Sequence, residues 1–518
     1  MLALLAAGPA FARASACEAL ARSTDARVRI DSARDVAAAD GLPVHCQLTG
    51  MIGARTGADG KPYGVGFELR LPVDWSGRLL FQGGGGLDGE VKPALGNVPW
   101  AGARTLPGAL ARHYAVVSMD GGHRGDGAAF AADQQARRDF AEAAAPQVTR
   151  AAKALAQRYY GRAPERSYFM GCSNGGREAM MAAERDPQAF DGIVAANPGF
   201  RLSASALEEV WETAVFNAAA PRDAAGMPIL AQALSDADLK LVAGAVLAKC
   251  DGADGLVDGL AFNHSCRFDP GVLVCRPGSA AASCLPQAKV DLLRLVFAGA
   301  HGADGGALYA SWPFDAGIAA PAWRRQKLGT APGAQANAGN AVRGSEAWYS
   351  VMLRAPVPTP LPSPAAVLAS ATSEAAGASA ALFQVAPDGM ARFAARGGKL
   401  LLLQGMADPV FSADDLVTWY QRAQGASPAP APWLRLFLSP GIGHCGGGPG
   451  LDNVDPLATI EAWVEQGSAP AQLLATGASL PGVARPLCAY PAYAQYDGKG
   501  DVALATSFTC VASTGSAP

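Results

Sequence analysis

Histidine, charge and long apolar runs are all scarce in this sequence. Only six of the 518 residues are histidines, so a mechanism that needs a histidine base has few candidates. Charged residues make up 17% of the chain, 42 of them basic and 45 acidic, and no basic run occurs. A net charge of −3 without a basic patch excludes the attraction that polyanions require, so no nucleic acid is expected as a partner.

The N-terminus is the one strongly apolar stretch of the chain. Residues 1–12 are almost entirely apolar, and Ala-x-Ala sites end at Ala12 and Ala16. This predicts a signal peptide over residues 1–16, although the usual basic residues are missing; the alternative is an apolar terminus of a cytosolic protein. No later apolar run is near the roughly 20 residues that cross a bilayer, so no membrane span is expected. The sequence therefore predicts a secreted or periplasmic protein.

Cysteine is present in an even number but not in metal-binding or redox spacing. No CxxC pair occurs, which disfavours a zinc or thiol-redox role. An even count fits an exported, oxidised protein, although sequence alone does not select the pairs. The ten positions are Cys17, Cys46, Cys172, Cys250, Cys266, Cys275, Cys284, Cys445, Cys488 and Cys510.

Strand-like and helical patterns alternate in two parts of the chain. Half of the residues are apolar, enough for a sizeable core. Short apolar runs predict strands, and 3.6-residue periodicity predicts helices between them, so the pattern favours a mostly parallel α/β sheet. The expected strands are 65–70, 78–82, 114–119, 168–170, 399–404 and 433–438, and the expected helices 140–160, 177–185 and 413–422.

The alternation of strand-like and helical patterns stops between about Phe200 and Asp388. This stretch contains four cysteines within 35 residues, alanine- and proline-rich segments and scattered tryptophans. We interpret it as an insertion into one catalytic unit rather than as a separate module. The expected organisation is a catalytic domain of residues 17–200 and 387–518, interrupted by a lid domain of residues 201–386.

A candidate nucleophile lies in the sequence Gly171-Cys172-Ser173-Asn174-Gly175. It matches G-x-S-x-G and follows an expected strand and precedes an expected helix, as a nucleophile elbow requires. A plain glycine turn is the alternative. In this kind of fold the acid and then the histidine follow the serine along the chain. Asp408 and His444 follow two expected strands in that order.

The rival acids and bases fit less well. Asp414 and Asp415 fall inside an expected helix, where we expect them on its solvated face. His123 also follows an expected strand, but it precedes the serine.

Acyl transfer through a serine also needs two N–H donors for the oxyanion of the tetrahedral intermediate. The residue after the nucleophile, Asn174, is expected to supply one. The second is expected from the glycine run 83–86 after the strand 78–82, from Gly84 or Gly85. A flexible turn is the alternative for this run.

Cys172-Ser173, Asp408 and His444-Cys445 together resemble the CS-D-HC arrangement of the tannase and feruloyl esterase family, which includes monohydroxyethyl terephthalate hydrolases. The resemblance extends from Cys17 to Cys510. It implies an α/β-hydrolase fold with a large lid and a serine carboxylic ester hydrolase without an organic cofactor. It also implies five disulfides: Cys17 with Cys46, Cys172 with Cys445, Cys250 with Cys266, Cys275 with Cys284, and Cys488 with Cys510.

A metal site is a further candidate within the insertion. Asp251, Asp254 and Asp258 fall within eight residues and are interspersed with glycines, a density of oxygen ligands that suits calcium. The spacing is not that of an EF-hand, and the residues alone fit solvated Asp-Gly turns equally well. The resemblance implies a structural Ca²⁺ in the lid, bound by these carboxylates and by the carbonyls of Leu256 and Leu260.

The expected substrate is a small ester of an aromatic acid, of the feruloyl, galloyl or terephthaloyl monoester type. An acyltransferase or peptidase with the same triad is one alternative, and a catalytically silent, calcium-stabilised binding protein is another. The oligomeric state stays open. Candidate pocket residues, each equally compatible with a core role, are Trp312, Phe314, Trp323, Trp348 and Tyr349, and candidate carboxylate anchors are Arg324, Arg325 and Arg343.

Overall fold

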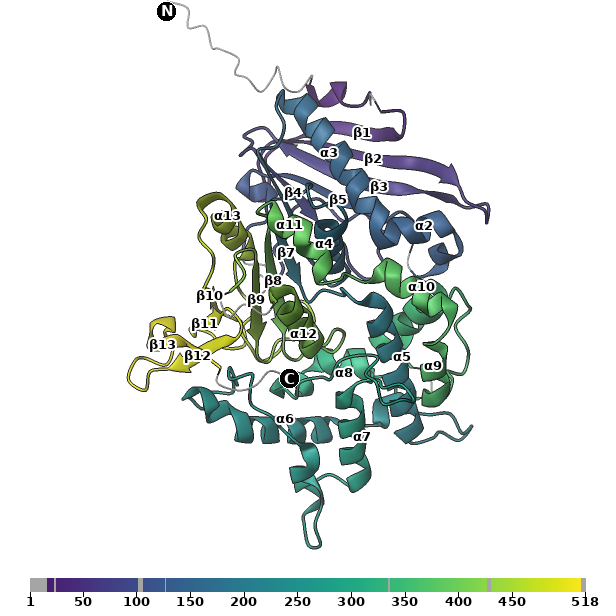
Figure 1. The fold of residues 1–518 in the computed structure, drawn as a ribbon, viewed down its shortest axis with the longest axis vertical. Helices are drawn as coiled ribbons and strands as arrows, with labels where there is room; N and C mark the ends of the chain where they lie inside the picture. Colours follow the sequence, from purple (N-terminus) through teal and green to yellow (C-terminus); the bar gives the residue numbers. More distant parts are fainter. Residues whose placement is uncertain are drawn as a thin grey trace, which may run out of the picture.

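The core of the molecule is a nine-stranded sheet (Figure 1). A computed structural model describes residues 16–22, 25–100, 106–125, 127–333, 336–425 and 430–513, so the expected signal peptide lies outside the described residues except for Ala16. The sheet has the order β1-β2-β3-β5-β4-β6-β7-β8-β9. Its strands are β1 (Val28–Val36), β2 (His45–Thr56), β3 (Pro62–Pro72), β4 (Arg78–Gln82), β5 (Ala115–Met119), β6 (Arg166–Cys172), β7 (Gly192–Ala196), β8 (Lys399–Gly405) and β9 (Leu434–Ser439).

Two kinds of pairing divide this sheet. The six strands from β5 to β9 pair in parallel, which confirms the predicted mostly parallel α/β sheet. β1, β2 and β3 form an antiparallel extension, of which only part of β3 is expected from the sequence pattern. In β8 every residue after Lys399 is buried, as expected for a strand covered by helices on both faces.

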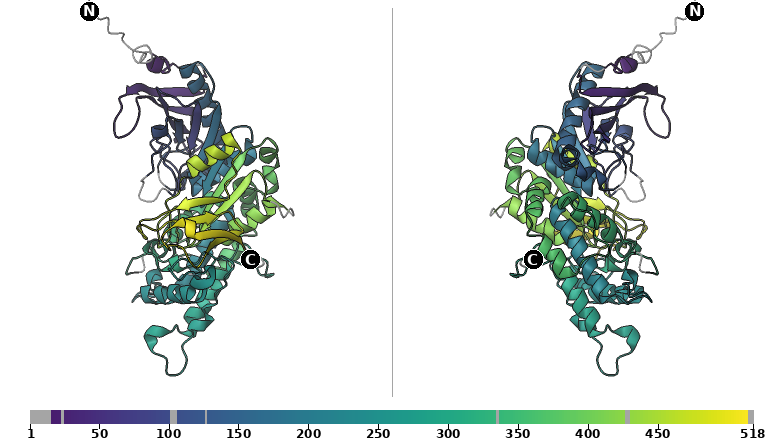
Figure 2. Two further views of the ribbon diagram at one scale, coloured as in Figure 1. Left: turned by 90° about the vertical axis from the view of Figure 1, so that its left-hand side faces the viewer. Right: turned by 90° about the vertical axis from the view of Figure 1, so that its right-hand side faces the viewer.

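Helices cover both faces of the parallel region (Figures 1 and 2). The face of Leu400 and Leu402 packs with α3 (Ala144–Tyr160), α4 (Asn174–Arg185) and α12 (Ala413–Gln424). The face of Leu401 and Leu403 packs with α13 (Pro456–Gln466). Alternate residues of each strand therefore enter two separate cores. The short helix α2 (Gln134–Arg138) lies between β5 and α3 in the chain.

The chain between β7 and β8, residues 197–398, contributes no strand to this sheet within its described residues. We call it the β7–β8 segment. Its helices α6 (Asp236–Cys250) and α7 (Gln287–Ala298) lie at the end of the molecule opposite β1 and β2 (Figures 1 and 2). The other α-helices of the segment are α5 (Leu202–Ala219), α8 (Pro321–Lys327), α9 (Pro364–Ser370), α10 (Glu374–Phe383) and α11 (Ala391–Ala395).

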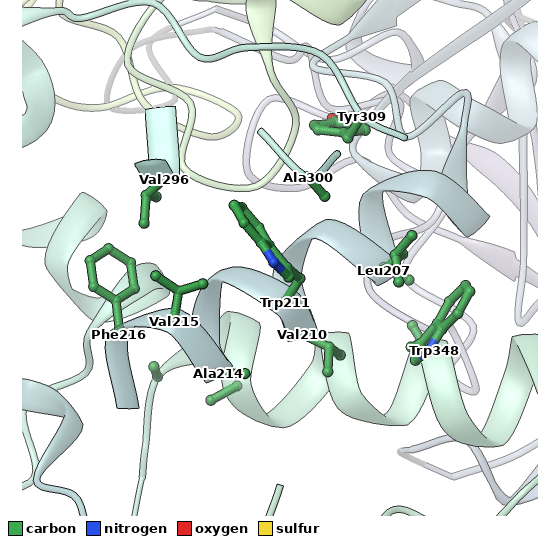
Figure 3. Close-up of a cluster of buried hydrophobic side chains, with 14 of the residues drawn as sticks. Leu207, Val210, Trp211, Ala214, Val215, Phe216, Val296, Ala300, Tyr309 and Trp348 are labelled. Carbon is green, nitrogen blue, oxygen red and sulfur yellow. The ribbon is translucent and has the colours of Figure 1, made fainter. Parts of the chain in front are cut away.

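A large hydrophobic core is centred on α5 of the β7–β8 segment (Figure 3), and residues outside the segment, among them Phe130, Phe140 and Phe411, also enter it. Trp211 on α5 packs against Val296 and Ala300, and Trp348 packs beside Leu207. The candidate pocket residues Trp312, Trp323, Trp348 and Tyr349 are all buried in this cluster. These four side chains pack in this core, and Trp312 also lines a cleft beside α12.

Two small hairpins follow the sheet at the C-terminal end. They are formed by β10 (Gln472–Ala475) with β11 (Arg485–Cys488), and by β12 (Ala492–Tyr496) with β13 (Phe508–Ala512). The second hairpin is tied to the first by the disulfide Cys488–Cys510.

In the part of the chain that the structure describes, no single helix is long and apolar enough to cross a membrane. One bent pair, α9 and α10, passes that test jointly, on length and composition alone.

A buried ion pair holds α8 against α5. The ammonium of Lys327 lies 2.5 Å from the carboxylate of Glu212, and the two side chains are 2% and 0% exposed. Lys327 also lies over the ring of Trp312, 3.5 Å from its centroid, and Asn340 donates to the same carboxylate at 2.9 Å. Removing one partner of such a pair leaves the other charge buried and uncompensated.

We therefore expect Lys327→Met to lower the free energy of unfolding by about 3–5 kcal/mol, measured by chemical denaturation. The matched control is Arg294→Met, which breaks an exposed pair with Asp269 and costs at most about 1 kcal/mol. Equal losses in the two variants would contradict the argument.

Candidate active site

Ser173 lies at the turn between β6 and α4, as the sequence pattern predicts. Its backbone has φ 61° and ψ −126°, a conformation that non-glycine residues rarely adopt. The neighbouring glycines make the turn possible, because a Cβ at Gly171 would lie 2.5 Å from the backbone of Gly175, and one at Gly175 would lie 2.6 Å from the carbonyl oxygen of Gly84. The turn therefore raises the hydroxyl above the sheet while the glycine loop after β4 packs directly against it.

The hydroxyl of Ser173 meets His444, and His444 meets Asp408. Ser173 Oγ lies 2.8 Å from His444 Nε2, and His444 Nδ1 lies 3.0 Å from Asp408 Oδ2 and 3.1 Å from Oδ1. A carboxylate only accepts, so Nδ1 carries the proton and donates it, and the unprotonated Nε2 accepts from the serine hydroxyl. The structure thus brings together the three side chains that the sequence analysis selected, in the arrangement of a nucleophile, a base and an orienting acid.

The carboxylate of Asp408 is buried and well supplied with donors. Burial alone would raise its pKa, but the pairing with His444 and the hydrogen bonds that it accepts hold the pKa below its ordinary value. Asp408 is therefore ionised in the folded protein and keeps the imidazole in one tautomer. The donors other than His444 are the side chains of Asn197 and Gln404 and the backbone amides of Val410 and Phe411.

Asn197 is a site residue that the sequence analysis missed. Its amide donates to Asp408 Oδ2 at 2.7 Å, and its oxygen accepts from the indole of Trp100 at 2.8 Å. It directly follows β7 and has a φ of 41°. Its place after a strand, next to the sheet edge that carries Ser173 and Asp408, was the signal that could have identified it.

A disulfide joins the loops of the serine and the histidine. Cys172 bonds to Cys445 across a separation of 273 residues, so the neighbours of Ser173 and His444 are covalently linked. All described cysteines are paired, and the five bonds have the connectivity that the resemblance implies.

The two candidate oxyanion donors in the glycine loop after β4 differ in whether their amides are already hydrogen-bonded. The amide of Gly84 donates to the carboxylate of Glu178 at 3.1 Å and is therefore already used. Gly85 is exposed, and a Cβ built on it meets nothing within 4 Å. Asn174 starts α4, where backbone amides have no partner within the helix. Gly85 and Asn174 thus offer the available amides at this site.

The rival acid Asp415 is not on a solvated face. It is 3% exposed and pairs with Arg201 at 2.5 Å, and Asp414 accepts from Ser311 at 2.7 Å. The expectation of a solvated face was wrong because α12 packs against other elements on that side. His123 is also buried and stacks on Phe130 at 3.8 Å, which places it in the core.

The three aspartates of the loop after α6 accept hydrogen bonds from the loop's own backbone, and one of them also pairs with an arginine outside it. Asp251 and Asp254 are buried, and their carboxylates accept from backbone amides of residues 256–262. Asp258 accepts from the amide of Leu260 and pairs with Arg485 at 2.6 Å. The donor chemistry suits calcium, but within the described ranges no three His, Cys, Asp or Glu side chains are arranged to bind a metal ion.

The three arginines that are candidate anchors for a substrate carboxylate differ in their surroundings. Arg324 is held by Asp236 and by the carbonyls of Ala231 and Leu234. Arg325 and Arg343 are exposed. Phe314 stacks on the ring of Phe297 at 3.9 Å and lines a cleft of about 740 Å³ between the β7–β8 segment and α12.

Comparison with known proteins gives a consistent result. The family model described as tannase and feruloyl esterase matches residues 46–511. The chain is 38% identical to a mono(2-hydroxyethyl) terephthalate hydrolase of Piscinibacter sakaiensis, over 93% of this chain and 87% of that one, and 27% identical to a probable feruloyl esterase B-2 of Aspergillus flavus, over 79% and 76%. The crystal structure of feruloyl esterase B from Aspergillus oryzae superposes with a TM-score of 0.77 at 23% identity, covering 96% of this chain and all of that one, which confirms the fold class. The chain belongs to the tannase and feruloyl esterase family of carboxylic ester hydrolases.

Proposed function

We propose that this protein hydrolyses esters of aromatic acids through an acyl-enzyme on Ser173. The observation that carries the proposal is the continuous hydrogen-bonded series from Ser173 through His444 to Asp408. A serine hydroxyl is a weak nucleophile until a base takes its proton, and here the base lies at 2.8 Å with its tautomer fixed by a buried carboxylate.

The reaction has two halves. His444 Nε2 takes the proton of Ser173 as the oxygen attacks the ester carbonyl, and then gives it to the departing alcohol as the tetrahedral intermediate collapses to an acyl-serine. Water repeats the sequence: it loses a proton to His444, attacks the acyl carbon, and releases the acid as the proton returns to Ser173. Asp408 keeps the imidazole oriented and stabilises its protonated form.

The amides of Asn174 and Gly85 are the proposed donors to the oxyanion in both halves. Gly84 is the less suitable of the two glycines because its amide already serves Glu178. Backbone donors that are fixed before the reaction stabilise the developing charge without a reorganisation cost, and losing one typically costs about 3 kcal/mol.

The relatives support an aromatic acyl group. One relative's name specifies a terephthalate monoester and others a feruloyl ester, so both classes are proposed substrates, together with galloyl esters. We further propose Arg325 or Arg343 as the anchor for a substrate carboxylate, since both guanidinium groups are exposed and Arg324 is occupied.

We also propose the domain division 17–200 and 387–518 for the catalytic domain and 201–386 for the lid. The hydrophobic core around α5 supports it, because most of its residues come from the β7–β8 segment. A secreted or periplasmic location is proposed on the five disulfides, which persist in oxidising compartments.

A structural calcium ion in the lid is the last proposal. Three carboxylates and the carbonyls of Leu256 and Leu260 are available in one loop. Asp251 and Asp254 are buried, and Arg485 pairs only with Asp258. Since these carboxylates are turned toward backbone amides, binding would require them to turn toward the ion. A bound ion would neutralise the loop and brace the lid, with no step in the reaction.

The esterase proposal is tested with mono(2-hydroxyethyl) terephthalate, methyl ferulate and methyl gallate, with acid release followed by chromatography. We expect hydrolysis of at least one ester and a loss of about 10⁶-fold in kcat in Ser173→Ala. An inactive wild-type protein, or an active Ser173→Ala variant, would refute the proposal. Ester formation with an added alcohol in place of acid release would favour an acyltransferase.

The disulfide Cys172–Cys445 is expected to serve both stability and catalysis. Replacing both cysteines by serine should lower the free energy of unfolding by about 2–4 kcal/mol and also lower kcat, because the loops of Ser173 and His444 lose their link. The control is the double serine variant of Cys275 and Cys284, whose bond closes a short loop before α7. That variant should keep the wild-type kcat; a kcat unchanged in both variants would contradict the catalytic part.

The calcium proposal is tested by thermal unfolding after chelation and after addition of Ca²⁺ or Mg²⁺. Calcium at about 100 times its Kd should stabilise the protein by about 2.7 kcal/mol, and Asp254→Asn should abolish this response. Asp304→Asn is the control, because Asp304 forms an exposed Asp-Gly turn outside this loop, in which its carboxylate accepts from the amide of Gly306. A melting temperature that is indifferent to chelation and to added calcium would exclude the site.

A further inference from the structure

A buried group of polar side chains lies directly behind the two proposed oxyanion donors. Its centre is the side chain of Asn174, which is 3% exposed. The amide nitrogen of Asn174 donates to Asp88 at 2.5 Å and to Glu178 at 3.2 Å. Its amide oxygen accepts from Arg177 Nε at 2.6 Å. Of this polar group, only Asn174 belongs to the glycine motif, and no member belongs to the triad.

Glu178 connects the two walls of the oxyanion site. Its Oε1 accepts from the side chain of Asn174, and its Oε2 accepts from the backbone amide of Gly84. Gly84 precedes one proposed oxyanion donor, Gly85, and Asn174 supplies the other. A single carboxylate, 4% exposed, thus joins the loop after β4 to the first turn of α4.

The bond to Gly84 ties the loop to α4 at the residue before Gly85. The amide of Gly84 is engaged by Glu178, whereas Gly85 is exposed and a Cβ built on it meets nothing within 4 Å. The turn is closed by Asp88, whose amide donates to the carbonyl of Gly85 at 3.1 Å. Asp88 itself has a φ of 48°, a strained conformation that the surrounding bonds must maintain.

Asp88 and Glu178 place two carboxyl groups around one amide nitrogen. Burial, and next to it the charge of Glu178, raise the pKa of Asp88 well above its ordinary value. Arg177, fully buried, places its guanidinium beside both carboxyl groups, and its terminal nitrogens donate to the carbonyls of Phe140 and Ala141.

We propose that Glu178 is a positioning residue of the esterase reaction, which sets the oxyanion site by holding Gly84 and the Asn174 side chain in one fixed arrangement. Glu178 does not touch the reacting atoms. It acts through the backbone amides of Gly85 and Asn174, and its loss should weaken transition-state binding more than substrate binding. The inference rests on the proposed esterase function and identifies a residue that the elbow motif does not include.

The test compares Glu178→Ala with Glu178→Gln on the best ester of the substrate panel. Glu178→Ala removes both acceptors, and we expect a loss of about 100-fold in kcat, close to the loss of one oxyanion donor, with KM within about twofold of wild type. Glu178→Gln fits the same space and retains an acceptor for Gly84. The kcat of Glu178→Gln should therefore be at least about tenfold higher than that of Glu178→Ala.

A second measurement separates positioning from a general loss of structure. A trifluoromethyl ketone analogue of the ester adds to Ser173 and forms a tetrahedral oxyanion, so its Ki should rise in parallel with the loss of kcat/KM across the variants. The binding of the product acid, which has no such oxyanion, should stay unchanged. Melting temperatures measured alongside show which variants fold.

Glu184→Gln is the matched control. Glu184 lies on the same helix and its carboxylate is also largely buried, but it accepts from Ala386 outside the oxyanion loop. It should keep the wild-type kcat and Ki. If the wild type is active, two results would overturn the positioning role alone. One is an unchanged kcat in a folded Glu178→Ala variant, and the other is a Ki that does not follow kcat/KM across the variants. An inactive wild type would instead overturn the proposed function on which it rests.

Discussion

The strained backbone of Ser173 is the constraint on which the rest of the site depends. A φ of 61° and a ψ of −126° are costly for a serine, on the order of 1–3 kcal/mol, and persist only where the surroundings enforce them. Here the turn is held between β6, a strand of the buried sheet, and α4, a helix of the layer that covers it. Gly171 and Gly175 have no side chains, so the backbones on the two sides of the turn come into contact. Because that approach also admits the carbonyl of Gly84, one strained residue brings the nucleophile and the oxyanion loop together.

Fixing the serine is useful only if the histidine is fixed relative to it. His444 lies 271 residues later, after β9, and two independent devices hold it in place. The disulfide Cys172–Cys445 links the neighbouring residues covalently, and Asp408 holds the imidazole through its second nitrogen. Asp408 is itself held by donors at the ends of two strands, since Asn197 follows β7, Gln404 lies in β8, and the amides of Val410 and Phe411 follow β8. A buried carboxylate with this many donors stays ionised and has one orientation.

The sequence predicted the parts of this arrangement that depend on chain order and local pattern. The parallel strands, the elbow, and the positions of Asp408 and His444 after two strands all follow from short-range signals, and the scarcity of histidine narrowed the choice of base. Contacts that depend on how distant segments pack were not predictable in this way. Asn197 gives no pattern of its own, and Asp415 was expected in solvent because helical periodicity does not reveal which further element covers a helix. β1 and β2 were also not predicted, since the mixed burial of their residues gives no clear alternation of apolar and polar positions.

The residues that sequence patterns miss share one physical role. Asn197 and Glu178 are buried polar side chains whose partners come from segments far apart in the chain, and each satisfies groups that would otherwise be costly to bury. A motif describes the atoms that react, because reactivity demands particular residue types at particular spacing. The side chains that orient those atoms need only an acceptor or donor at the right point, and many residue types on many segments supply one. Such residues are therefore found by tracing where each buried hydrogen-bonding group of the site is satisfied, and in this molecule the trace leads from the amide of Gly84 to Glu178.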